Sequence, residues 1–299
     1  MRDETHWRVT ARSLFATYAL EPARVGAGAP ARIRGRRRPP LFKERVIALT
    51  LTPLEGHVAV IAGATGGIGT ATAKLMAEAG ASILVGYNSD SQRAAALVDA
   101  LPGGAARHEA LPMAMGDSAT LRAAARRCEA RWGRCDILVN AAGHTHAIPH
   151  HDLAALDDET FDRIMISNVR GPFACIREFA PLMKSSGNAV VVNVSSISGF
   201  TGSGSNVAYC ASKAALDNLA LSLGRALGPE IRVVSVSPAA VNTGFVPGRT
   251  PATLEAAAAK TPLKRLMEPE EVAWAALAAV THLRMATGTR IVIDGGRHL

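Results

Sequence analysis

Three residues of the sequence have side chains and a spacing suited to proton transfer, namely Ser196, Tyr209 and Lys213. Tyr209 and Lys213 lie four residues apart within a helical pattern, so their side chains share one face of the helix. A free tyrosine has a pKa of about 10 and is a poor acid or base at neutral pH. Because a nearby ammonium group favours the tyrosinate, we expect Lys213 to lower the pKa of Tyr209, whose hydroxyl then exchanges a proton with an alcohol or carbonyl oxygen.

Ser196 directly follows a β-branched, apolar run over residues 189–195, which predicts a buried strand. Open α/β sheets bind their ligands at the C-terminal ends of the strands, and this rule places Ser196 at the ligand-binding edge. Its hydroxyl can hydrogen-bond a substrate oxygen on which charge develops. The three side chains together indicate acid/base chemistry at an oxygen-bearing carbon.

A glycine-rich segment indicates a dinucleotide-binding loop. It reads Ala62-Gly63-Ala64-Thr65-Gly66-Gly67-Ile68-Gly69, with the spacing GxxxGxG, and stands between a predicted strand and a predicted helix. Glycines allow the backbone to turn sharply and to approach a pyrophosphate, and the helix N-terminus presents free N–H groups to the phosphates. The segment therefore predicts the pyrophosphate contact of a nicotinamide dinucleotide.

The end of the second predicted strand bears on the choice of cofactor. It reads Tyr87-Asn88-Ser89-Asp90, with Arg93 close behind. An acid at the first positions would bind the ribose 2′-hydroxyl of NAD(H), whereas a small polar or basic residue admits the 2′-phosphate of NADP(H). Asn88 and Ser89 favour NADP(H), while Asp90 and the absence of a basic residue at the tip keep NAD(H) open.

Strand and helix patterns alternate along the chain. Apolar, β-rich runs predict strands at 57–62, 82–87, 136–140, 189–195, 231–237 and 290–293, with a weaker one near 108–113. Helical patterns cover 70–79, 119–132, 206–227 and 270–283. Continuously apolar strands are typical of a parallel sheet that is buried on both faces. The alternation predicts an α/β fold with a single doubly wound parallel sheet and helices on both faces.

These residues match the motifs of a known family. The sequence Tyr209-Cys-Ala-Ser-Lys213 is a YxxxK motif with Ser196 thirteen residues upstream, and it accompanies the glycine loop, Val139-Asn140-Ala141-Ala142-Gly143, Asn168 and Ile293-Asp294-Gly295-Gly296. From about residue 57 to residue 296 the chain resembles the classical short-chain dehydrogenases/reductases, in particular the branch of the 3-oxoacyl-carrier-protein reductases. The resemblance implies a Rossmann-type sheet of about seven strands in the order 3-2-1-4-5-6-7.

The resemblance also implies a role for each matching residue. Tyr209 is the general acid/base, Lys213 binds the nicotinamide ribose, and Ser196 polarises the substrate carbonyl. Asn168 holds a water molecule that relays protons from the lysine to solvent. The cofactor contacts are completed by Asn140, Ala141, Gly143, Pro238 and Thr243. Residues 242–266 form a substrate lid, and the chain assembles as a homodimer or homotetramer.

Histidine and cysteine have simpler interpretations. His144, His146, His150 and His151 lie close together in the sequence, but a polar loop at the rim of a substrate pocket explains them better than a metal site does, and no metal is expected. Cys210 follows the catalytic tyrosine and points about 100° away from it on a helix, which predicts packing rather than a nucleophile. The chain has no CxxC pair and no pattern of a disulfide framework, which fits a location in the reducing cytoplasm.

Basic residues are concentrated at the start of the chain. The net charge is +8, but residues 1–45 hold eleven Lys or Arg and four acids, which leaves +1 for the other 254 residues. We interpret residues 1–52 as a basic, disordered extension or a start site placed too far upstream, with an organelle-targeting segment as the alternative, and residues 53–299 as the NAD(P)-binding domain. The body of the chain predicts neither a nucleic-acid nor a membrane partner.

The sequence thus predicts an oxidoreductase that moves a hydride between NAD(P)(H), with NADP(H) favoured, and a small carbonyl or secondary alcohol. A second hypothesis is a catalytically silent, dinucleotide-binding regulator. Such a protein is expected to lack the tyrosine or the lysine, and both residues are present in this chain. A third is nucleic-acid binding through the basic extension, which predicts binding that is sensitive to salt.

Overall fold

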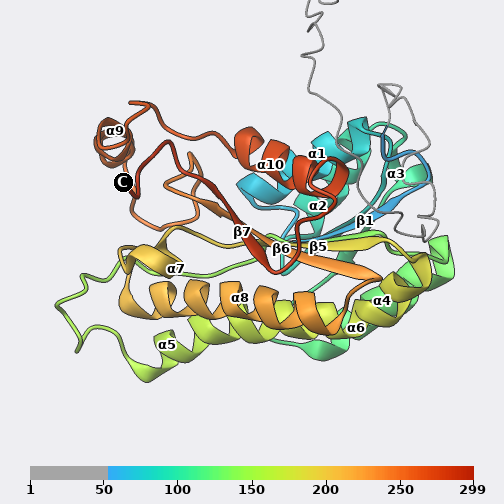
Figure 1. Ribbon diagram of the computed structural model, residues 1–299, viewed down its shortest axis with the longest axis horizontal. Helices are drawn as coiled ribbons and strands as arrows, with labels where there is room; N and C mark the ends of the chain where they lie inside the picture. Colours follow the sequence, from blue (N-terminus) through green and yellow to red (C-terminus); the bar gives the residue numbers. More distant parts are fainter. Residues whose placement is uncertain (1–52) are drawn as a thin grey trace, which may run out of the picture. The chain divides into compact units, whose positions relative to one another are not determined.

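Seven parallel strands form one sheet in the order β3-β2-β1-β4-β5-β6-β7 in the computed structural model, which describes residues 53–299 (Figure 1). This order confirms the predicted fold class. The predicted extension over residues 1–52 lies outside the described residues. The strands are β1 (Val58–Ala62), β2 (Ser82–Tyr87), β3 (Glu109–Pro112), β4 (Ile137–Asn140), β5 (Ala189–Val194), β6 (Ile231–Pro238) and β7 (Thr289–Ile293).

Helices cover both faces of the sheet (Figure 1). One face is covered by α1 (Gly67–Glu78), α2 (Ser91–Ala100) and α10 (Pro269–Thr281), and the other by α4 (Ser118–Trp132), α6 (Gly171–Ser186) and α8 (Val207–Ala226). The remaining elements are α3 (Gly104–Arg107), α5 (Asp158–Met165), the π-helical turn η1 (Ile166–Arg170), α7 (Ser198–Thr201) and α9 (Pro251–Ala259).

Two hydrophobic layers explain why the strands are apolar at every position. In β1, Ala59 and Ile61 pack into the layer under α1, α2 and α10, whereas Val58 and Val60 pack into the layer under α4, α6 and α8. Successive side chains of a strand point to opposite faces. Because both faces are covered, both sets of side chains must be apolar, and the strand loses the alternation that a half-exposed strand would show.

The structure contains helices that the sequence pattern did not single out, most clearly α2, α5 and α6. Helix α6 begins at Gly171-Pro172 and carries Pro181 in its interior. Proline removes a backbone donor and disfavours the helix interior, so these residues hide the helical period of residues 171–186 from sequence reasoning. The buried side chains of α6, among them Phe179, outweigh this local penalty.

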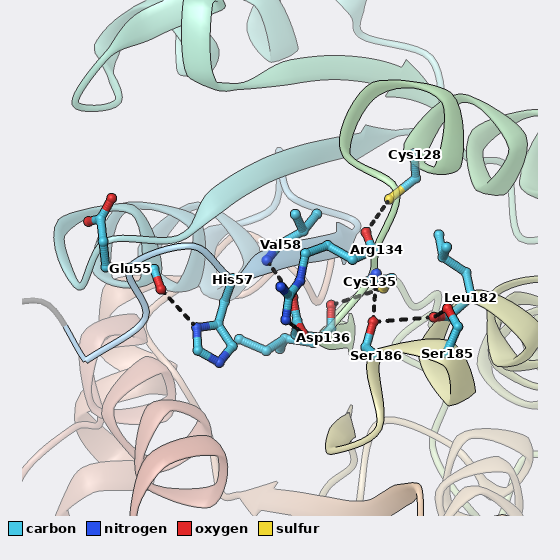
Figure 2. A network of polar contacts seen from close by, with 11 residues as sticks. Glu55, His57, Val58, Cys128, Arg134, Cys135, Asp136, Leu182, Ser185 and Ser186 are labelled. Carbon is cyan, nitrogen blue, oxygen red and sulfur yellow. Dashed lines mark hydrogen bonds and ion pairs between the residues drawn. The ribbon is translucent and has the colours of Figure 1, made fainter.

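A buried aspartate joins the strands at the end of the sheet opposite to their C-terminal ends (Figure 2). Asp136 accepts a hydrogen bond from the Val58 nitrogen at 2.8 Å and two from the Arg134 guanidinium at 2.9 and 2.7 Å. Its main-chain oxygen accepts from the Val190 nitrogen of β5. Asp136 therefore fixes β1, β4 and β5 in register where they start, and so aligns the C-terminal ends that carry the site.

None of the helices within residues 53–299 is long and apolar enough to cross a membrane.

Candidate active site

A cavity of about 810 Å³ lies at the C-terminal ends of the strands and brings together most of the residues predicted for the site. Segments far apart in the sequence contribute to its wall. The predicted residues that line it are Gly66, Gly67, Ile68, Gly69, Ala141, Gly143, Ser196, Tyr209, Lys213, Pro238 and Thr243. The cavity therefore lies at the edge where open α/β sheets bind their ligands.

The glycine loop is shaped as a dinucleotide requires. Gly63 has a φ of +79°, and a Cβ placed on it would lie 2.5 Å from the Ala142 nitrogen. A Cβ on Gly67 would lie 2.6 Å from the Thr243 methyl group, and one on Gly69 would collide with the Gly63 oxygen. A side chain at Gly63 or Gly69 would collide with backbone atoms, and one at Gly67 would require Thr243 to move.

Helix α1 begins directly after this loop, and the backbone N–H groups of its first turn have no capping side chain. Its N-cap is Gly66, which makes no side-chain capping bond, and its first turn holds no acid. The N–H groups of the first turn and the positive end of the helix are therefore free for phosphate oxygens. The residues of the loop fit the pyrophosphate of a nicotinamide dinucleotide.

Ser196, Tyr209 and Lys213 meet in the cavity from β5 and α8. Ser196 and Lys213 are buried, and Tyr209 is partly buried. The Lys213 Nζ donates a hydrogen bond of 2.8 Å to the Val194 oxygen and lies 5.6 Å from the centre of the Tyr209 ring. A cation at this distance interacts favourably with the ring face, so the helical spacing of four residues does bring the two side chains together.

The electrostatics differ from the prediction. Burial raises the pKa of Tyr209 to about 12, although hydrogen bonding with Ser196 and the positive charge of Arg249 act in the opposite direction. Burial also lowers the pKa of Lys213 to about 8, which the charge of Asp217 partly offsets. The expected lowering of the tyrosine pKa by Lys213 is not found in this arrangement, because loss of hydration outweighs the nearby charges.

The start of α8 is held by a residue that sequence reasoning missed. Asn206 is the N-cap of the helix, and its side-chain oxygen accepts a hydrogen bond of 2.7 Å from the Tyr209 nitrogen. The Asn206 amide also donates to the His146 oxygen at 2.8 Å. An asparagine directly before a helical pattern is an N-cap signal that identifies this residue in the sequence. Asn206 thus ties the turn that carries Tyr209 to the loop after β4.

Asn168 lies in the π-helical turn and is fully buried outside the cavity wall. Its amide nitrogen donates to the His144 oxygen and to Ser212 Oγ, both at 3.0 Å, and its side-chain oxygen accepts from the His144 nitrogen at 2.8 Å. Both amide hydrogens are therefore used within the protein. The side chain acts as a link between the π-turn, the loop after β4 and α8.

Other predicted cofactor residues lie outside the cavity wall. Asn140 is the buried last residue of β4, and its amide nitrogen donates to the side-chain oxygen of Asn193 in β5 at 2.9 Å. Gly63 and Thr65 belong to the glycine loop but are not among the lining residues, and Asn88 and Ser89 are exposed after β2.

Two residues beside Asn88 and Ser89 clarify the adenosine end of the site. Arg93 lines the cavity, and Asp90 caps α2 by accepting a hydrogen bond from the Arg93 nitrogen at 2.8 Å. The carboxylate that kept NAD(H) open is therefore engaged in a helix cap.

The substrate side of the cavity is formed by the segment after β6 and by residues near position 298. Phe245 lies with its ring centre 6.0 Å from that of Tyr209, and Val246, Arg249 and Ala257 add to the wall. These residues belong to the segment 242–266 that the family resemblance assigned as a lid. Arg297 and His298 also line the cavity, and no sequence signal pointed to them.

The His144 and His146 rings and the Cys210 thiol take part in packing, whereas His150 and His151 are exposed. Within residues 53–299, no three His, Cys, Asp or Glu side chains are grouped as metal ligands would be. The His144 and His146 rings pack edge to face at 4.9 Å, and burial lowers the pKa of His144. Cys210 is buried, and this burial raises its pKa.

Comparison with known proteins assigns the chain to a family. Residues 63–298 match the family described as enoyl-(acyl carrier protein) reductase. The chain is 36% identical over 247 residues to the cis-4-hydroxycyclohexanecarboxylate dehydrogenase of Sinomonas cyclohexanicum, which covers 80% of this chain and 96% of that protein. It is 32% identical over 247 residues to the 3-oxoacyl-(acyl-carrier-protein) reductase of Thermotoga maritima, with 81% and 98% covered.

A solved structure extends the similarity to three dimensions. The crystal structure of a short-chain dehydrogenase/reductase of the glucose/ribitol dehydrogenase type from Brucella melitensis is 27% identical to the chain and superposes with a TM-score of 0.78, covering 84% of this chain and 100% of that one. Since the family match and the relatives each extend over most of the described residues, the chain belongs to the short-chain dehydrogenase/reductase family of NAD(P)-dependent oxidoreductases.

Proposed function

We propose that the chain transfers a hydride reversibly between NADP(H) and a small carbonyl or secondary-alcohol substrate, with Tyr209 as the general acid/base. The convergence of Ser196, Tyr209 and Lys213 with the glycine loop in one cavity carries this proposal. The nicotinamide, when bound, supplies or accepts the hydride. Tyr209 donates a proton to the carbonyl oxygen during reduction and removes it from the hydroxyl during oxidation.

Ser196 and Lys213 support this proton transfer. The Ser196 hydroxyl hydrogen-bonds the substrate oxygen and stabilises the negative charge that develops on it. Lys213 lies 5.6 Å from the centre of the tyrosine ring and, as the family resemblance implies, would bind the nicotinamide ribose there. Asn168 and Asn206 hold the turn that carries these groups, and they act as positioning residues.

The proposal is tested by Tyr209→Phe in the full-length protein. We expect kcat to fall by roughly 10²–10⁴-fold, the range that general acid/base catalysis supplies. Binding of NADPH, followed by its fluorescence, should stay within about twofold of wild type, because the glycine loop is unchanged. Substantial residual turnover on a panel of ketones and aldehydes would refute the role of Tyr209.

The preference for NADP(H) is supported by Arg93 and Asp90. Arg93 places a guanidinium in the cavity wall near the end of β2, and the Asp90 carboxylate is used by the α2 cap. Arg93→Gln should weaken NADPH binding about tenfold and leave NADH binding unchanged, because only NADPH carries the 2′-phosphate. Arg126→Gln, on the exposed face of α4, is the control. Equal loss for both cofactors would contradict this assignment.

We also propose a homodimer or homotetramer. Apolar side chains are exposed on the outer helices and beside β7, with Leu221 of α8 at 43%, Phe173 of α6 at 38% and Trp274 of α10 at 59% exposure. Exposed apolar surface of this kind favours association between copies of one chain. Light scattering during size-exclusion chromatography tests this, and a monomer at micromolar concentration would contradict it.

A further inference from the structure

Positive charge on the substrate side of the cavity is not explained by the proposed hydride transfer. Arg249 and Arg297 line this side together with His298 and the last residue, Leu299, and no Asp or Glu side chain lines the cavity. Arg249 follows β6 in the lid segment, and Arg297 lies just beyond β7. Arg93 stands apart from both, because it belongs to α2 at the cofactor end.

Neither guanidinium forms an ion pair among the described residues. The acid closest to Arg297 in the sequence is Asp294, and its carboxylate accepts hydrogen bonds from the main-chain nitrogens of Gly296 and His298 and from the His298 ring. By contrast, Arg265 of the lid segment pairs with Glu271. The lid segment therefore contains one arginine that forms an ion pair, Arg265, and one that forms none among the described residues, Arg249, whose charge is available to a ligand.

Arg249 lines the same cavity as Tyr209, the proposed acid/base. Its positive charge lowers the pKa of Tyr209. Phe245, four residues earlier, packs beside the tyrosine ring. Arg249 is exposed to solvent in the cavity wall, and an unpaired guanidinium there can bind a carboxylate or phosphate in the bidentate geometry that matches its donors.

We propose that the substrate carries an anionic oxygen group, a carboxylate or a phosphate, which Arg249 binds on the lid side of Tyr209 with Arg297 as a second cation. This inference rests on the proposed function and narrows its substrate class. Arg249 is a specificity-determining residue in this scheme, since it holds the anionic end while the carbonyl carbon faces the catalytic groups.

The test compares matched charged and neutral ketones in steady-state assays with NADPH. Suitable pairs are 2-, 3- and 4-oxo carboxylates with their methyl esters, and dihydroxyacetone phosphate with dihydroxyacetone. The readout is the ratio of kcat/KM for the charged member to that for its neutral partner. Any effect of Arg249 on the acidity of Tyr209 acts on both members and cancels in this ratio.

We expect wild type to prefer the charged member of at least one pair, and Arg249→Gln to reduce that preference about 10- to 100-fold, the range that a charge-assisted hydrogen bond supplies. Arg249→Lys should restore part of the preference, because it keeps the charge and loses the bidentate geometry. Arg297→Gln should reduce the preference by a smaller factor. Arg126→Gln should leave the ratio unchanged.

The possible failures are distinguishable. Turnover without a preference for the charged member, or a preference that survives Arg249→Gln, would overturn the inference and leave the proposed function standing. A rise in the KM for NADPH with an unchanged ratio would assign Arg249 to the cofactor and also overturn it. Failure of wild type to reduce any member of the panel while it binds NADPH would contradict the proposed function itself.

Discussion

Replacing Lys213 by methionine should stabilise the protein, purified without cofactor, at pH 7 while abolishing its turnover. Lys213 is 4% exposed, and burial lowers its pKa to about 8. The unfolded chain has the ordinary lysine pKa of about 10.4. Below pH 8 the folded protein must therefore either carry a poorly hydrated ammonium group or release its proton, and both cost free energy of folding.

The magnitude follows from the two pKa values. Each unit of difference corresponds to about 1.4 kcal/mol, so the charged lysine costs about 3 kcal/mol at pH 7. Methionine removes this cost but also removes the hydrogen bond to the Val194 oxygen, worth about 1 kcal/mol. We expect Lys213→Met to raise the free energy of unfolding by about 2 kcal/mol at pH 7.

The pH dependence distinguishes this explanation from a simple packing effect. Between pH 8 and about pH 10 the unfolded chain binds more protons at Lys213 than the folded protein does, so wild-type stability gains from this group as the pH rises. Methionine lacks this contribution, and the advantage of the variant should fall to about zero by pH 10.

Guanidinium chloride denaturation at pH 7, 8.5 and 10, followed by tryptophan fluorescence, measures the difference. Lys74→Met on the exposed face of α1 is the matched control and should show no such trend. A difference that stays constant with pH, or a variant less stable than wild type at pH 7, would refute the reasoning.

Three further outcomes follow from the same structure. Asp136→Ala should lower the free energy of unfolding by about 2–3 kcal/mol, because it leaves the Val58 N–H buried without an acceptor. Asp136→Asn keeps an acceptor and should lower it by only about 1 kcal/mol. Equal losses for the two variants in chemical denaturation would contradict this explanation. Gly63→Ala should weaken NADPH binding more than tenfold, because the added Cβ meets the loop after β4. Gly133 also has a positive φ, but nothing lies within 4 Å of a Cβ placed on it, so Gly133→Ala should lower the stability of the protein without weakening NADPH binding. Calorimetric titration with NADPH compares the two variants. Iodoacetamide at pH 7 should leave activity intact, because burial raises the pKa of Cys210 and keeps its thiol protonated; rapid inactivation traced to this residue by mass spectrometry would disprove it.

Local patterns made much of this fold predictable. Strands such as β2 and β5 read as apolar runs because they are buried on both faces, and the observed bounds of β2 are those predicted. The strand order came from the family resemblance rather than from the runs themselves. Helix α6 shows the limit of local reasoning, because Pro181 interrupts the helical pattern while long-range packing of Phe179 and its neighbours keeps the helix.

The candidate site divides in the same way. The sequence by itself determined the chemical groups, because a spacing of three to four residues fixes which side chains share a helix face and a glycine spacing fixes how a loop can turn. Tyr209, Lys213 and the loop from Gly63 to Gly69 are of this kind.

Only the tertiary structure decided which distant residues meet and how strongly they are withdrawn from water. Arg249 and Arg297 lie 48 positions apart in the sequence and line one cavity, which no local pattern indicates. The pKa values of Tyr209 and Lys213 move away from the values at which free side chains titrate, because burial removes hydration that only the folded chain can take away. Residue types and short spacings are properties of the chain, whereas convergence and burial arise from contacts that form when the chain folds.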